Sequence, residues 1–110
     1  MNLKIDVQDA SQEYRITLAG EIDAYTAPNL KEKFMEIAEQ DGVKITIDLT
    51  DVSYMDSTGL GVFIALLKAS KKHNGSLRFV GVSERLKRLF DITGLTDILN
   101  VNSQVEGGVK

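Results

Sequence analysis

The chain contains no cysteine, no apolar run long enough to span a bilayer and no excess of positive charge. Without cysteine, a disulfide framework and thiolate chemistry are both excluded, which fits a cytoplasmic protein. The N-terminal segment "MNLKIDVQD" lacks the apolar stretch of a secretory signal, so we expect a soluble, unprocessed chain without membrane contact. The formal net charge of -3 argues against direct binding of nucleic acid, because that binding depends on clustered Lys and Arg.

Length and composition indicate one compact domain that spans residues 1–110. A chain of 110 residues, 43% of them hydrophobic, can bury a core of its own, and we expect no second domain. The terminal segment "SQVEGGVK", from about residue 103, is polar and rich in glycine. We therefore expect that tail to be frayed.

Hydrophobic periodicity predicts the strands and helices. Apolar and polar residues alternate in four segments, as expected for strands with one buried face. These strands cover residues 3–7, 13–20, 43–49 and 76–82, and a short last strand is expected at 95–101. Helical spacing and capping residues predict helices within 26–42, 56–75 and 83–94. The segment "QDASQ" at 8–12 is interpreted as the loop of a hairpin.

The alternation also selects the architecture. A parallel sheet covered on both faces has nearly continuous apolar strands, whereas the strands here alternate. We therefore expect an α/β fold in the order β-β-α-β-α-β-α-β, with a mixed sheet and helices packed on one face.

The segment "MDSTGLG" at 55–61 stands between a strand and a helix. Either Asp56 or Ser57 is a suitable N-cap, and Thr58 fits the first helical turn. Gly59 and Gly61 are harder to explain, because glycine inside a helix costs roughly 1 kcal/mol relative to alanine. The two glycines suggest close approach by another group.

The helix after this segment has an apolar arc wider than one sheet face needs. Leu60, Phe63, Ile64 and Leu67 form one stripe, and further apolar residues occupy much of the remaining circumference. Two interpretations stay open. The helix is either buried between its neighbours on three sides, or it presents an apolar surface that includes Leu60 to a partner.

Enzyme chemistry finds no support in the sequence. Ser57 lacks the G-x-S-x-G context of a catalytic serine, and the single histidine, His73, lies roughly four turns further along the same helix. The segment "GLGVFI" completes no phosphate-binding fingerprint, and Asp48, Asp51 and Asp56 are read as cap and turn residues rather than a magnesium site. We expect no catalytic residue, no metal site and no cofactor.

What remains is a hydroxyl group at a helix N-terminus. A phosphoryl group on Ser57 is expected to find backbone N–H donors and the positive end of the helix dipole. The same modification would add about 1.5 to 2 negative charges to a contact surface. The fold should therefore tolerate a phosphate that a binding partner rejects.

Three motifs together resemble a known family. "GEIDAYTAP" at 20–28, "DVSYMDSTGLGVF" at 51–63 and "SERLKRLFDITGL" at 83–95 are similar to segments of the STAS-domain anti-anti-sigma factors of Gram-positive bacteria. The resemblance covers nearly the whole chain and is greatest to the general-stress, sigma-B branch. It implies a mixed sheet with helices on one side.

The resemblance also implies a function and its residues. The family's phosphorylated serine matches Ser57, with Thr58 as a secondary acceptor. In the unphosphorylated form, family members bind an anti-sigma factor that is also their serine kinase and displace the sigma factor, and a PP2C-type phosphatase reverses the modification. The expected partner-binding residues are Asp23, Asp56, Ser57, Thr58, Gly59 and Leu60. Sequence alone equally permits a plain turn or cap role for Asp23, and the alternative function is a non-switching structural or sensory module of a stress-signalling complex.

Overall fold

The computed structural model describes residues 2–92, 94 and 103–107. Within them, strands and helices follow the predicted order. The elements are β1 Leu3–Ala10, β2 Glu13–Ile22, α1 Ala27–Ala38, β3 Lys44–Met55, α2 Ser57–Lys72, β4 Ser76–Val82, α3 Glu84–Ile92 and β5 Ser103–Gly107. No helix in this described part of the chain is long and apolar enough to cross a membrane.

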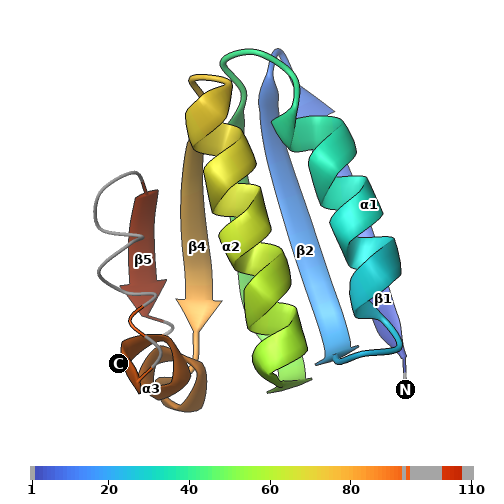
Figure 1. Ribbon diagram of the computed structural model, residues 1–110, viewed down its shortest axis with the longest axis vertical. Coiled ribbons are helices and arrows are strands. Elements are labelled where there is room, and N and C mark those ends of the chain that lie inside the picture. The colour runs from blue at the N-terminus through green and yellow to red at the C-terminus, as the bar shows by residue number, and fades with distance from the viewer. Residues whose placement is uncertain (1, 93, 95–102, 108–110) are drawn as a thin grey trace.

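The strands form one sheet in the order β1-β2-β3-β4-β5. The β1–β2 pair is antiparallel, and the β2–β3, β3–β4 and β4–β5 pairs are parallel. Figure 1 shows α1 and α2 side by side across one face of the sheet, with α3 at the end of the sheet where β3 and β4 finish. The predicted mixed sheet with helices on one face is confirmed.

The hairpin is tighter than its sequence suggested. Strand β1 ends at Ala10 and strand β2 begins at Glu13, so only Ser11 and Gln12 make the turn. Both residues have positive φ, 51° and 68°. Two-residue turns with positive φ at both positions are common in hairpins, because their twist matches that of the flanking strands.

Two strand boundaries differ from prediction. Strand β3 was expected to end at Leu49 but continues to Met55, which pairs with Ile22 of β2. Strand β5 occupies 103–107, so the prediction that the tail is frayed from about residue 103 was wrong for this segment. The strand expected at 95–101 lies outside the described residues.

The core lies between the sheet and its helices. Phe63 of α2 is fully buried, and its ring lies 5.9 Å from that of Phe34 on α1, 5.1 Å from Phe79 on β4 and 6.4 Å from Phe90 on α3. Burying aromatic rings is among the largest sources of stabilisation in a small core. This cluster therefore fixes the position of α2 over the sheet.

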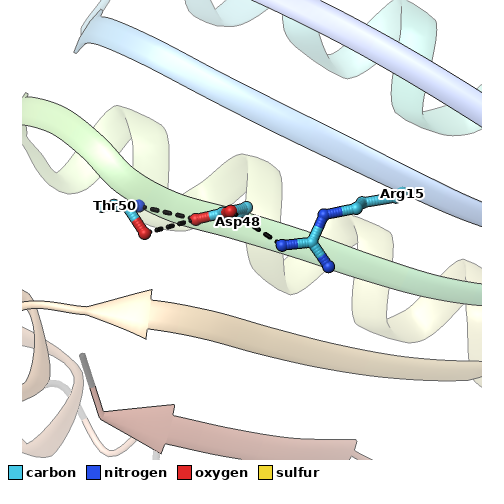
Figure 2. A network of polar contacts seen from close by, with 3 residues as sticks. All are labelled: Arg15, Asp48 and Thr50. Carbon is cyan, nitrogen blue, oxygen red and sulfur yellow. Dashed lines mark hydrogen bonds and ion pairs between the residues drawn. The ribbon is translucent and has the colours of Figure 1, made fainter. Parts of the chain in front are cut away.

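The opposite face of the sheet carries a polar network (Figure 2). The Asp48 carboxylate accepts hydrogen bonds from the Thr50 hydroxyl at 2.6 Å and the Thr50 N–H at 3.0 Å, and it pairs with the Arg15 guanidinium at 2.9 Å. Partial burial by itself would raise the pKa of Asp48. The two bonds from Thr50, together with the bond and the charge of Arg15, outweigh that effect and hold the pKa below its ordinary value of 3.8.

This network predicts a pH-dependent contribution to stability. Because the folded pKa of Asp48 is lowered, its contribution is complete above the unfolded pKa and is lost as the pH falls through the folded pKa. We expect Asp48→Asn to lower the free energy of unfolding by about 1 kcal/mol at pH 7, a value kept small by solvent screening. Urea titrations from pH 7 to pH 3 should show the gap between variant and wild type closing below about pH 4.

Asp6→Asn provides the matched control for that experiment. Asp6 is exposed on β1, in the same cross-strand row as Asp48 and therefore on the same face of the sheet. Its substitution should change the free energy of unfolding by less than about 0.5 kcal/mol. A gap for Asp48→Asn that stays constant with pH would contradict the assignment.

Candidate functional site at the start of helix α2

Asp56 caps helix α2. Its backbone is extended, and its Oδ1 accepts hydrogen bonds from the N–H groups of Thr58 at 3.0 Å and Gly59 at 3.2 Å. Ser57 is the first helical residue, and both Ser57 and Thr58 are exposed. Of the two candidates for the cap, Asp56 is therefore the residue that fills the role, which leaves the Ser57 hydroxyl at the surface.

Parallel pairing brings a second segment beside this helix start. Met55 pairs with Ile22, and the N–H of Asp56 donates to the carbonyl oxygen of Ile22 at 3.3 Å. Neighbouring parallel strands end at the same edge of a sheet, so the residues that follow each strand lie close together. Asp23, which follows β2, and Ser57, which begins α2 shortly after β3, thus lie at the same end of the sheet.

Asp23 has a structural role in its loop. The side chain is only 6% exposed, and its Oδ1 accepts from the N–H groups of Tyr25 at 2.9 Å and Thr26 at 3.1 Å. Its Oδ2 is buried without a hydrogen-bond partner among the described residues. The sequence left open whether Asp23 contacts a partner or stabilises its own turn. These contacts show that it stabilises the turn.

Tyr25 is the exposed residue of the same loop. Its side chain is 82% exposed, which is unusual for an aromatic residue in a chain of this size. Sequence reasoning did not select it, although an aromatic side chain inside the loop motif "GEIDAYTAP" is a signal that could have done so. Tyrosine is enriched at protein interfaces, and this loop presents one directly.

The two glycines of the helix start have different surroundings. A Cβ atom at Gly59 would lie 2.7 Å from Cγ2 of Ile22 and 2.8 Å from Cγ of Met55, closer than packed side chains allow. A Cβ atom at Gly61 would meet nothing within 4 Å. Close approach was predicted for both glycines. At Gly59 the protein's own core supplies it, whereas at Gly61 no atom of the described chain comes close.

Leu60 is buried and cannot serve as an exposed contact. Its side chain is 4% exposed, and Val62 and Leu66 are buried as well. The wide apolar arc of α2 is explained by burial against the sheet and the neighbouring helices, which was one of the two open interpretations. Leu60 therefore belongs to the core of the unbound chain, and its expected contact with a partner gains no support from this burial.

Comparison with known proteins shows the family of this chain. Residues 4–108 match the family described as the STAS domain. The chain belongs to the STAS family. It is 53% identical over 110 residues to the anti-sigma-B factor antagonist of Bacillus subtilis (strain 168), with 100% of both chains covered. The resemblance to the sigma-B branch that the motifs indicated is thereby confirmed.

Solved structures agree with the STAS fold. A crystal structure of an anti-sigma factor antagonist from Mycobacterium paratuberculosis has a TM-score of 0.77 at 26% identity, covering 88% of this chain and 82% of that one. The structure of the anti-sigma factor antagonist SpoIIAA in its unphosphorylated form has a TM-score of 0.77 at 19% identity, covering 94% and 88%. At 19% identity the likeness establishes the shared fold alone.

In this STAS domain, two of the backbone N–H groups expected to receive a phosphate on Ser57 already have a hydrogen-bond partner. The N–H groups of Thr58 and Gly59 are already bound by the Asp56 carboxylate, so they are not free to receive a phosphate on Ser57. A phosphoryl group there would instead stand beside a carboxylate. The positive end of the helix dipole partly offsets that repulsion, but the helix start would become strongly negative.

Proposed function

We propose that this STAS domain is an antagonist of an anti-sigma factor, switched by phosphorylation at Ser57. The unphosphorylated form binds an anti-sigma factor that is also a serine kinase, and the sigma factor is released. Phosphorylation of Ser57 ends the binding, and a PP2C-type phosphatase restores it. In this scheme the protein acts in the cytoplasm as a ligand and substrate of enzymes and is not itself an enzyme.

The observation that carries the proposal is the position of Ser57. A serine that is exposed at the first turn of a capped helix is accessible to a kinase without unfolding. Full-length similarity to an anti-sigma-B factor antagonist supports the choice of partner. The adjacent loop supports a contact surface that extends beyond the serine, because Tyr25 projects from it while Asp23 fixes its shape.

The contact surface also explains the direction of the switch. Ser57, Thr58 and Tyr25 offer hydroxyl groups and one aromatic ring, a combination suited to a specific interface. A phosphate on Ser57 adds negative charge next to the Asp56 carboxylate at the middle of that surface. A partner that accommodates the neutral hydroxyl then faces two anionic groups side by side.

The proposal predicts a single modification at Ser57. After incubation with ATP and the anti-sigma-B factor of Bacillus subtilis, the protein should gain the mass of one phosphate, and tandem mass spectrometry should place it on Ser57. Ser57→Ala should remain unmodified, and Thr58→Val should still be modified. An unmodified wild-type protein that nevertheless binds the anti-sigma factor would favour a non-switching STAS module instead.

A further inference from the structure

A groove lies beside the candidate site, where β3 extends beyond β4. The pairing of β3 with β4 runs from Lys44 to Asp48, yet β3 continues to Met55. On that side, no strand among the described residues pairs with 52–55, and α3 stands opposite (Figure 1). The space between them has a volume of about 550 Å³. An unpaired strand edge facing a helix is an arrangement in which some domains bind extended peptides.

The lining of the groove is largely apolar and partly exposed. Met55 and Leu86 line it as buried residues, Tyr54 is 47% exposed and Ile92 is 76% exposed. Single exposed apolar residues are common, but two that line one groove form a patch that a partner can cover. The groove therefore offers a place for an apolar side chain.

The border of the groove is positively charged. Arg85 and Arg88 are both exposed and both line the groove, whereas the exposed acidic residues of α3, Glu84 and Asp91, do not line it. This local positive charge contrasts with the formal net charge of -3 of the whole chain. A segment that carries a carboxylate next to an apolar side chain complements such a groove.

We propose that the groove between β3 and α3 binds an extended, acidic and apolar segment of the anti-sigma factor. The segment pairs along 52–55, places an apolar side chain against Ile92 and directs a carboxylate to Arg88. Met55 lines the groove and directly precedes Asp56 and Ser57, so the groove continues the contact surface of the helix start. This proposal rests on the proposed function and adds a second contact region that carries no phosphorylation site.

The test compares two groove variants with a matched control on the same helix. Arg88→Glu and Ile92→Asp change the groove, whereas Lys87→Glu makes the same charge reversal at an exposed neighbouring position that does not line it. Calorimetric titration against the anti-sigma-B factor of Bacillus subtilis should show about tenfold weaker binding for each groove variant. Lys87→Glu should change the dissociation constant by less than about threefold.

Hydrogen exchange supplies a second readout. When the anti-sigma-B factor is bound, amides within 52–55 should exchange more slowly, as expected if a segment pairs with this edge. Thermal unfolding checks that the variants are folded, which their exposed positions favour. If wild type binds and the groove variants bind equally well, the groove proposal fails and the proposed function stands. If wild type does not bind, both fail.

Discussion

Phosphorylation of Ser57 is expected to weaken binding to the anti-sigma factor by roughly a hundred- to several-thousand-fold, or about 3 to 5 kcal/mol. The size of the effect follows from where the charge is placed. Ser57 begins α2, and the Asp56 carboxylate already accepts hydrogen bonds from the N–H groups of Thr58 and Gly59 in the first turn of that helix. A dianion on Ser57 therefore has few protein donors to neutralise it, and a desolvated partner surface must face it directly.

Variants at Ser57 distinguish the effect of added negative charge on the affinity from the effect of a changed side-chain shape. Ser57→Asp carries less charge than a phosphate, and its affinity should lie between those of the phosphorylated and unphosphorylated forms. Ser57→Ala should bind like the unphosphorylated wild type, because it removes the acceptor without adding charge. Isothermal titration calorimetry of the four forms measures this order directly. Equal affinities for the phosphorylated and unphosphorylated protein would rule out the switch.

Stability controls are needed for these variants. Ser57 is exposed, so Ser57→Asp should leave the fold intact and alter the free energy of unfolding by only about 1 kcal/mol. Loss of the cooperative thermal transition in Ser57→Asp would show that a binding defect arises from unfolding. The affinity comparison would then have to rest on the phosphorylated protein.

Gly59→Ala is expected to be less stable than Gly61→Ala by about 1 to 3 kcal/mol. Both substitutions gain the same helix propensity, roughly 1 kcal/mol, so this gain cancels in the comparison. The difference comes from packing, because a methyl group at Gly59 collides with Ile22 and Met55, whereas one at Gly61 meets open space. Denaturant titration of the two variants measures the difference.

The same pair of variants tests how the site is held together. Ile22 immediately precedes Asp23, and Met55 immediately precedes the cap residue Asp56, so a displaced Gly59 would disturb both loops. Gly61→Ala should keep or raise the stability of the wild type. Equal stabilities for the two variants would show that the core can absorb a methyl group at Gly59, contrary to the packing described.

Hydrophobic alternation made part of the fold predictable from the sequence. Alternation at Ile45, Ile47 and Leu49 identified the central strand and showed that one sheet face is polar. Alternation could not show where this strand ends. Beyond Leu49 the residues are mainly polar, and the strand continues because its pairing with β2 persists through two register shifts. Strand pairing across the sheet therefore outweighed the local pattern.

The site could be predicted less completely than the fold. The motif "MDSTGLG" indicated a capped helix start and selected Ser57, and the structure shows that residue exposed. The sequence could not distinguish a buried Leu60 from an exposed one, because both fit a wide apolar arc. The groove was also not predictable, since Tyr54 and Ile92 come from segments far apart in the sequence, and only the position of α3 opposite the end of β3 makes them line one groove.

Release of the sigma factor is the most direct measurement of the central claim. A preformed complex of the anti-sigma-B factor with a fluorescently labelled sigma-B would be titrated with this protein, before and after phosphorylation at Ser57. The account predicts that the unphosphorylated protein displaces sigma-B at near-stoichiometric concentration and that the phosphorylated protein does not at the same concentration. Displacement by both forms, or by neither, would contradict it.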